Sequence, residues 1–181
     1  TRPLSELGGL SLVVGLALAD AFENLAVQGV QVKWPNDVLV SGHKLSGVLV
    51  ELVQRERRVE YVIGIGVNVH ITEVESRRIE QPVTDLRRLG VALSRTDLVV
   101  VLMQRLREYL ELFERDGFGP FVTAFNDLHL YHRQTCVLVQ GNATTVGVVE
   151  GVGQQGELLL RTEDGVQRYH GGEVSLRAGS G

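Results

Sequence analysis

The spacing of the apolar residues changes near residue 130, and this change limits the folds that the chain can adopt. Before it, apolar residues recur at helical spacing in long segments. After about residue 132, short strands alternate with glycine-containing turns, a pattern typical of a small, strongly bent β-barrel. A length of 181 residues fits one larger domain followed by a small one. We therefore predict one domain over residues 1–129 and a second over residues 130–181.

The first domain opens with a strongly apolar segment, residues 7–22. This run is shorter than the roughly 20 residues needed to span a bilayer, and acidic side chains close it. We therefore predict no membrane association. The segment is instead interpreted as a helix over residues 4–26 that is buried on most faces, begins near Pro3 and is ended by Gly29.

The middle of the chain predicts a sheet with further helices. Apolar and polar residues alternate in several short runs, which is the pattern of strands with one buried face. The predicted strands are residues 30–34, 38–40, 45–52 and 59–69. A polar loop is predicted over residues 70–82, and further helices over residues 83–89, 94–117 and 118–128. The predicted fold class is α/β (α+β): a mixed, mainly antiparallel sheet backed by helices, followed by the small barrel.

Charge and composition narrow the classes of partner. The net charge is −4 and no basic run lines one face, which argues against a nucleic-acid site in this chain. The lone Cys136 cannot form an internal disulfide and suits a reducing, cytoplasmic compartment; we expect it to be a buried thiol. The histidines show no metal-ligand spacing, so no metal site is predicted. They are expected to be ordinary surface or turn residues: His43, His70, His129, His132 and His170.

Two lysines stand out among eighteen basic residues. Lys33 and Lys44 are the only lysines in the chain, and the single tryptophan, Trp34, lies between them. Lysine differs from arginine in carrying a compact ammonium with three rotatable donors. A site that holds a carboxylate and a phosphate at one spot could require that shape. Composition alone does not distinguish this interpretation from chance placement.

Three motifs near these lysines resemble the biotin protein ligase family. They are Lys33-Trp34-Pro35-Asn36-Asp37, Lys44-Leu45-Ser46-Gly47-Val48-Leu49-Val50-Glu51 and Gly64-Ile65-Gly66-Val67-Asn68-Val69. Residues 9–15 and 110–114 resemble two helices of that family, and residues 151–176 resemble its C-terminal SH3-like barrel. Together these segments cover nearly the whole chain in the family's order. The resemblance implies a class II synthetase-like catalytic fold followed by the barrel.

The resemblance also implies an activity. Biotin and MgATP would first form biotinyl-5'-adenylate, which would then acylate one lysine of a biotin carboxyl carrier domain of acetyl-CoA carboxylase. The chain is thus interpreted as a biotin–[acetyl-CoA-carboxylase] ligase, with biotin and ATP as substrates, Mg²⁺ bound to the nucleotide, and a homodimer among its expected assemblies. Cationic donors are needed in such a reaction because an anionic carboxylate must attack an anionic phosphate.

The family's functional residues are carried over only where the motifs match. Lys33 matches the lysine that contacts the biotin carboxylate and the phosphate, so it is the candidate catalytic and biotin-binding residue. Gly47 and Val48 match the strand against which the biotin ring lies, where a missing side chain makes room. Gly66 and Asn68 are candidates for the nucleotide side of the site. An Asx cap at the strand end is the alternative for Asn68.

The remaining motif residues have both structural and ligand interpretations. Asn36 and Asp37 orient the turn through side-chain to backbone bonds, or contact the nucleotide or a metal ion. Trp34 is interpreted as scaffold. Lys44 is expected to be a structural or interface cation rather than a catalytic one.

One departure from the family concerns residues that precede its apolar helix. The family carries there a glycine- and arginine-rich loop that wraps biotin and the adenylate phosphate, and no such loop occurs in these 181 residues. We therefore expect the chain to be a fragment that catalyses poorly by itself. A truncated, non-catalytic binding or dimerisation module is the alternative. Lipoate–protein ligase shares the fold but lacks the pairing of Lys-Trp-Pro-Asn-Asp with Gly-Val-Leu-Val-Glu, and is a weaker alternative.

Overall fold

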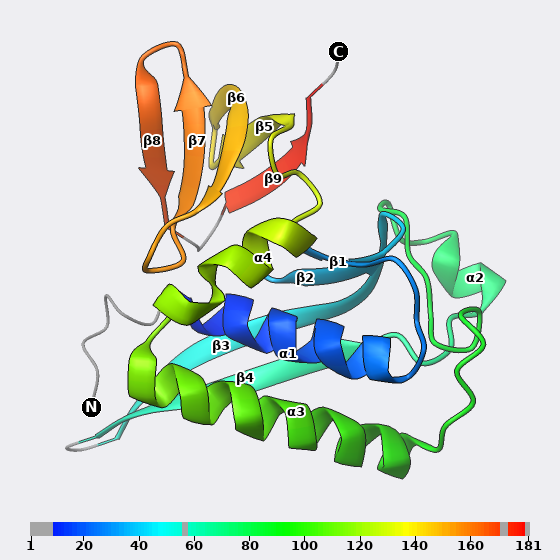
Figure 1. Cartoon of the computed structure of the whole chain (residues 1–181). Helices are drawn as coiled ribbons and strands as arrows, with labels where there is room; N and C mark the ends of the chain where they lie inside the picture. Colours follow the sequence, from blue (N-terminus) through cyan, green and yellow to red (C-terminus); the bar gives the residue numbers. More distant parts are fainter. Residues whose placement is uncertain (1–8, 56–57, 171–173, 180–181) are drawn as a thin grey trace.

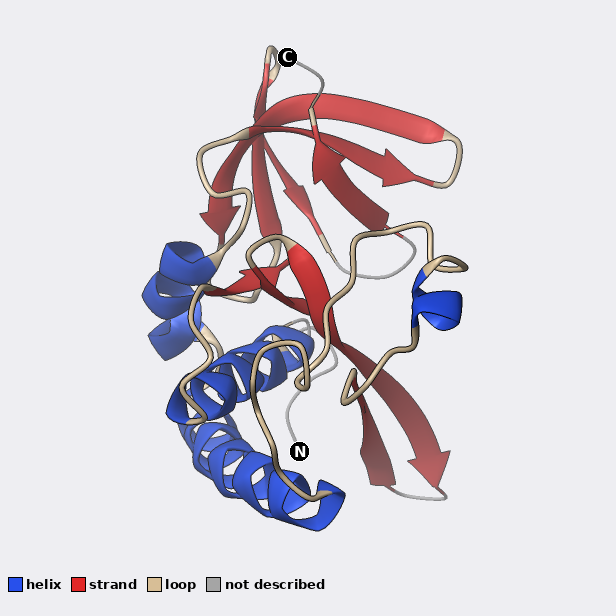
Figure 2. Ribbon diagram, turned by 90° about the vertical axis from the view of Figure 1, so that its right-hand side faces the viewer, coloured by secondary structure: helices blue, strands red, loops and turns tan. Residues whose placement is uncertain are grey.

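The structure is a computed structural model that describes residues 9–55, 58–170 and 174–179. The first sheet has four strands. Figure 1 shows helices against this sheet and a second, all-β part above it. Figure 2 shows the long helices on one side of the first sheet and the short helix α2 (Glu73–Ser76) on the other. Within the described residues, no helix combines the length and apolar character needed to cross a membrane.

The first sheet is antiparallel, with strands in the order of the sequence. Each predicted strand of this region is present, and the polar tip between the last two contains residues 56–57, which lie outside the description. The strands are β1 (Val30–Lys33), β2 (Asp37–Val40), β3 (His43–Arg55) and β4 (Arg58–Val67). Tight connections between consecutive strands give the antiparallel order directly.

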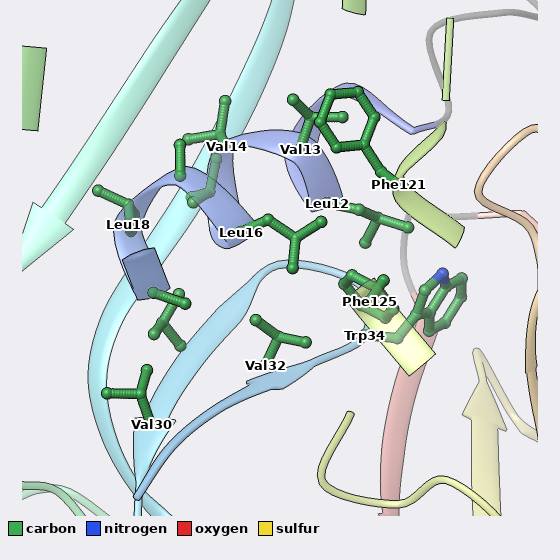
Figure 3. Packing of buried hydrophobic residues seen from close by; sticks show 14 of the residues in the cluster. Leu12, Val13, Val14, Leu16, Leu18, Val30, Val32, Trp34, Phe121 and Phe125 are labelled. Atoms are coloured by element: carbon green, nitrogen blue, oxygen red, sulfur yellow. The ribbon is translucent and has the colours of Figure 1, made fainter. Parts of the chain in front are cut away.

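Helices cover one face of this sheet. Helix α1 (Leu10–Asn24) is buried along nearly its whole length because it is apolar on almost every side. Helix α3 (Arg95–Asp116) packs on α1 through an apolar stripe at helical spacing: Leu98, Leu102, Leu106 and Phe113. The short helices η2 (Gly119–Phe121) and α4 (Val122–Leu128) close one end of the core. Figure 3 shows α1 side chains packed between the β1 valines and the rings of Phe121 and Phe125.

Three sequence-based expectations for this region need correction. Helix α1 ends at Asn24, several residues before Gly29, and its predicted start near Pro3 lies outside the described residues. The loop over residues 70–82 contains the short helix α2, which Thr72 caps. The helix predicted over residues 83–89 is wrong. Residues 82–84 instead lie extended beside Lys44, and turns follow them.

The C-terminal part consists of five antiparallel strands, as the change in sequence pattern predicts. They are β5 (Thr135–Gln140), β6 (Ala143–Val152), β7 (Leu158–Thr162), β8 (Gly165–Tyr169) and β9 (Val174–Ala178). Their order is β8-β7-β6-β5-β9. Helix α4 ends at Leu128 and β5 begins at Thr135, so residues 129–134 connect the two parts. The division near residue 130 remains our prediction.

The β6–β7 turn, residues 153–157, packs into the first part of the chain. The indole Nε1 of the buried Trp34 donates to the carbonyl oxygen of Gly156 at 3.1 Å. Asn126 of α4 accepts a hydrogen bond from the backbone N–H of Val152 at 2.9 Å. At Gly156 the backbone has a φ of +81°, and a Cβ would lie 2.6 Å from the Cα of Gly9. This close approach leaves no room for a side chain.

The junction predicts a specific cost for a methyl group at Gly156. Gly90 is a matched control, because its φ of +79° is nearly the same and a Cβ there would meet nothing within 4 Å. Gly90→Ala should lose only the backbone contribution, about 1–2 kcal/mol. Gly156→Ala should lose a further 1–3 kcal/mol or so from the clash with Gly9. Urea unfolding followed by circular dichroism measures both, and equal losses would contradict the packing described.

Candidate functional site

The strand register brings the sequence motifs into one row across the first sheet. Lys33 pairs with Asp37, Asp37 pairs with Gly47, and Gly47 pairs with Gly66. Directly opposed residues project to the same face of an antiparallel sheet. These four residues therefore share the face opposite α1 and α3. The side chain of Val48 lies on the other face, buried in the core.

Lys33 lies in a pocket formed where the two parts of the chain meet. The pocket has a volume of about 620 Å³. Its walls come from β1 and β2, the end of the polar loop, the connection to the second part, and strand β9. The lining residues are Lys33, Leu39, Gly42, Ile79, Glu80, Gln81, Pro82, Leu130, Tyr131, Leu176 and Arg177.

Burial and neighbouring cations act on the Lys33 ammonium. The pKa of Lys33 is lowered below its ordinary value, chiefly by burial, because removal from water disfavours the charged form. The nearby cations Lys44 and Arg177 lower it further, while the carboxylate of Asp37 raises it. An anion placed against Lys33 and Arg177 would be attracted by both cations, so the pocket favours a negatively charged ligand.

Lys44 forms an ion pair with Asp37 on the same face of the sheet. Its Nζ lies 2.6 Å from Oδ1 of Asp37, and both side chains are largely buried. A Cβ at Gly47 would lie 3.2 Å from Cε and 3.3 Å from Nζ of Lys44. The missing side chain at Gly47 therefore makes room for this ion pair. At Gly66 the nearest atom to an added Cβ is 4.0 Å away, so the sheet face is more open there.

The two asparagine side chains of the motifs bind backbone groups. Asn36 Nδ2 donates to the carbonyl oxygen of Val48 at 3.0 Å, and the Val48 N–H donates to the Asn36 carbonyl oxygen at 2.9 Å. Asn68 Nδ2 donates to the carbonyl oxygens of Lys44 and Thr84, both at 3.1 Å. Both residues thus fix the chain around the pocket. Ligand contacts by Asn36, Asn68 and Val48 remain predictions.

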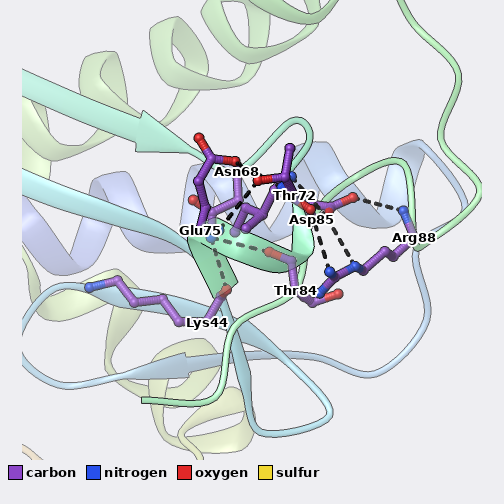
Figure 4. Close-up of polar contacts among 8 residues, drawn as sticks. Lys44, Asn68, Thr72, Glu75, Thr84, Asp85 and Arg88 are labelled. Atoms are coloured by element: carbon purple, nitrogen blue, oxygen red, sulfur yellow. Dashed lines mark hydrogen bonds and ion pairs between the residues drawn. The ribbon is translucent and has the colours of Figure 1, made fainter. Parts of the chain in front are cut away.

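The polar loop ends beside Lys44, where Figure 4 shows Asn68 bonded to Lys44 and Thr84. The Lys44 N–H donates to the Pro82 carbonyl oxygen at 2.9 Å, and the Thr84 N–H donates to the Lys44 carbonyl oxygen at 3.0 Å. The buried Asp85 accepts hydrogen bonds from the backbone N–H groups of Ile71 and Arg88. Residues 79–82, which form one wall of the pocket, are therefore held close to the sheet.

Comparison with known proteins connects this geometry to a family. The Biotin/lipoate A/B protein ligase family matches residues 2–68, and the Biotin protein ligase C terminal domain matches residues 134–177. The biotin–[acetyl-CoA-carboxylase] ligase of Paracoccus denitrificans is 30% identical over 173 residues, which cover 91% of this chain and 71% of that protein. The chain belongs to the biotin protein ligase family.

Further relatives agree with this assignment and define its extent. The bifunctional ligase/repressor BirA of Escherichia coli K12 is 36% identical over 171 residues, which cover 94% of this chain and 53% of BirA. The chain thus spans about half the length of this curated relative. The apo biotin protein ligase of Aquifex aeolicus superposes with a TM-score of 0.86 at 30% identity, covering 97% of this chain and 77% of that chain. The predicted fold class is confirmed.

A solved structure of a related biotin protein ligase is a complex with biotin and ATP. The structure of Aquifex aeolicus biotin protein ligase with biotin and ATP has a TM-score of 0.81 and 29% identity, and the match covers 99% of this chain and 74% of that chain. Among the residues described for our family member, no group of three or more His, Cys, Asp or Glu side chains is placed to hold a metal ion.

Sequence reasoning missed two residues in and near the pocket of this biotin protein ligase chain. Arg177 follows directly after the C-terminal segment used for the resemblance, so one more residue of that comparison would have included it. The expectation that His129 is a surface or turn residue is wrong, because its side chain is only 5% exposed. It is buried because the end of α4 packs beside Trp34, and this depends on tertiary contacts that no local pattern reveals.

The electrostatics of the pocket predict an abnormal titration of Lys33. Because the chain has two lysines, their side-chain signals can be followed by NMR in protein labelled with ¹³C and ¹⁵N, and a Lys33→Arg variant assigns them. Lys33 should titrate below its ordinary pKa of 10.5. Asp37→Asn should lower the pKa further, since the carboxylate stabilises the ammonium. An ordinary pKa for Lys33, or an increase in the Asn variant, would contradict the arrangement.

Proposed function

We propose that this chain functions in ATP-dependent ligation of biotin to a lysine of a biotin carboxyl carrier protein. The observation that carries the proposal is the row of Lys33, Asp37, Gly47 and Gly66, together with the pocket in which Lys33 and Arg177 meet. Support comes from relatives named biotin–[acetyl-CoA-carboxylase] ligase and from the related complex with biotin and ATP.

The proposed reaction has two steps. A carboxylate oxygen of biotin attacks the α-phosphorus of ATP, so a new P–O bond forms while the bond to the β-phosphate oxygen breaks and pyrophosphate leaves. The neutral amine of the carrier lysine then attacks the carbonyl carbon of biotinyl-5'-adenylate. A C–N bond forms, the C–O bond to AMP breaks, and the amine loses a proton. Mg²⁺ enters with ATP as part of the substrate.

Lys33 is the residue proposed to assist the first step. The reacting oxygen and the α-phosphate are both anionic, and their repulsion must be offset by donors already in place. A partly buried ammonium interacts more strongly with charge than one in water, because the local dielectric constant is lower. Arg177 lines the same pocket and would add a second positive charge on the phosphate side. Gly47 and Gly66 lie in the same row of the sheet as Lys33 but outside the lining of this pocket. They would provide an open surface beside it, and Asn36, Asp37 and Asn68 are proposed as further ligand contacts.

A second candidate function is a non-catalytic binding or dimerisation module. It is favoured by the exposed fractions of Leu49 and Val62, 58% and 49%, on neighbouring long strands. In the described part of the chain β4 is the outer strand of its sheet, so its free edge could pair with another strand. A chain that self-associates through this face and binds neither biotin nor its adenylate would support the module.

The first test of the proposed function is Lys33→Arg. The charge is kept, but a planar guanidinium cannot replace a compact ammonium at a site that contacts two groups. We expect biotin-dependent pyrophosphate exchange by the intact protein to fall about 100-fold. Arg107→Lys, the reverse exchange on the exposed surface of α3, is the control and should leave the rate unchanged. Exchange near the wild-type rate in the Lys33→Arg variant would exclude the assigned role.

The second test concerns the loop over residues 70–82. Arg77 and Arg78 are exposed at its centre, and its last residues line the pocket. Long polar loops beside a ligand site often close over the ligand. Trypsin should cleave after Arg77 or Arg78 in the free protein, and biotinyl-5'-adenylate should suppress that cleavage. Equal cleavage with and without the ligand would show that the loop does not close.

A further inference from the structure

His129 lies beside β1, the strand that carries Lys33. It follows the last residue of α4, and its ring is buried between two aromatic neighbours. The centroid of the Phe125 ring is 5.4 Å from that of His129, and the Tyr131 ring lies edge-on at 6.3 Å. The imidazole is therefore held in place by packing against these rings.

The hydrogen bonds of this segment bracket Lys33 on the outer edge of β1. On one side of the lysine, the Leu130 N–H donates to the carbonyl oxygen of Val32 at 2.9 Å. On the other side, the Trp34 N–H donates to Nε2 of His129 at 3.2 Å. Val32 and His129 are also paired as a parallel bridge. The imidazole thus supplies the acceptor that a backbone carbonyl of a further strand would otherwise provide.

We propose that His129 is a positioning residue for Lys33, acting as a neutral imidazole that carries its proton on Nδ1 and accepts the Trp34 N–H at Nε2. The assigned role in catalysis rests on the function proposed above, whereas the tautomer and the hydrogen bond do not. Because the two bonds fix the backbone immediately before and after Lys33, they set the direction in which its side chain enters the pocket.

Two observations favour this role over simple core packing. Nδ1 is buried, and no hydrogen-bond partner for it is found in the described part of the chain. An unpaired buried polar atom is unfavourable, so packing alone would favour an apolar side chain here. Burial, with added effects of His132 and Lys33, lowers the pKa of His129 to about 3. The ring therefore stays neutral, and Nε2 stays able to accept, throughout the physiological pH range.

The same segment connects Lys33 to the opposite wall of the pocket. Leu130 and Tyr131 follow His129 and line the pocket directly. Next, the Arg133 N–H donates to the carbonyl oxygen of Val149 in β6 at 2.8 Å. β6 lies next to β5, and β5 pairs with β9, which carries Arg177. His129 thus lies at the start of the segment that connects the first part, where β1 carries Lys33, to the second part, where β9 carries Arg177.

The wild-type protein provides the first test. The ¹⁵N chemical shifts and two-bond couplings of the His129 ring report which nitrogen carries the proton. The proposal requires a protonated Nδ1, an unprotonated Nε2 and a Trp34 amide that exchanges slowly with solvent. A proton on Nε2, or rapid exchange of the Trp34 amide, would overturn it. This test needs no substrate and no variant.

Two substitutions then distinguish the effect of the hydrogen-bond acceptor of His129 from the effect of its packing. His129→Gln places an amide oxygen near the position of Nε2, whereas His129→Leu fills similar space without an acceptor. In the Leu variant the Lys33 pKa should rise toward its ordinary value, because a misplaced ammonium regains water, and the Trp34 amide should exchange faster. The Gln variant should resemble wild type in both measurements. Leu106→Ala, a core change in α3, controls for lost stability and should leave the Lys33 pKa unchanged.

Pyrophosphate exchange by the intact protein provides the last comparison. His129→Leu should reduce kcat on the order of tenfold, with a smaller change in KM for biotin, and His129→Gln should restore most of it. A Leu variant with wild-type kcat and an unchanged Lys33 pKa would overturn the proposal. A wild-type protein without biotin-dependent exchange would refute the proposed function instead, and the tautomer and amide measurements would still decide whether His129 holds the strand.

Discussion

The pairing register of the first sheet is the constraint on which the site depends. Lys33, Asp37, Gly47 and Gly66 come from four strands, and only one register places them in a row. A shift of one residue in any strand would turn its side chains to the other face. The register is held because the opposite face is buried against α1, so the apolar alternation that forms the core also fixes the polar face.

Trp34 connects this sheet to the second part of the chain in two directions. Its backbone N–H binds His129 in the connecting segment, and its indole binds Gly156 in the β6–β7 turn. Trp34, the residue after Lys33, is thus hydrogen-bonded both to the connecting segment and to the second part. Because the pocket walls come from both parts, their relative position determines how far Lys33 lies from Arg177. Packing at the junction and electrostatics in the pocket are therefore linked.

Much of this organisation could be predicted from the sequence. The strands of the first sheet and the long helix α3 follow from apolar periodicity, and the change after residue 130 predicted an all-β second part. The helix predicted over residues 83–89 failed because residues 82–84 lie extended against Lys44 and Asp85 accepts a hydrogen bond from Ile71 of the neighbouring loop, contacts that no local signal shows. His129 and Arg177 were missed for a related reason. Their positions depend on contacts between segments far apart in the chain.

The central claim is that Lys33 meets the anionic part of biotinyl-5'-adenylate in the pocket between the two parts. An NMR titration of the labelled chain with biotinyl-5'-adenylate tests it most directly, because two lysine side-chain signals report the whole lysine content. The account predicts a saturable shift of the Lys33 signal that disappears on its replacement by arginine. Saturable binding that leaves the Lys33 signal unchanged would contradict it.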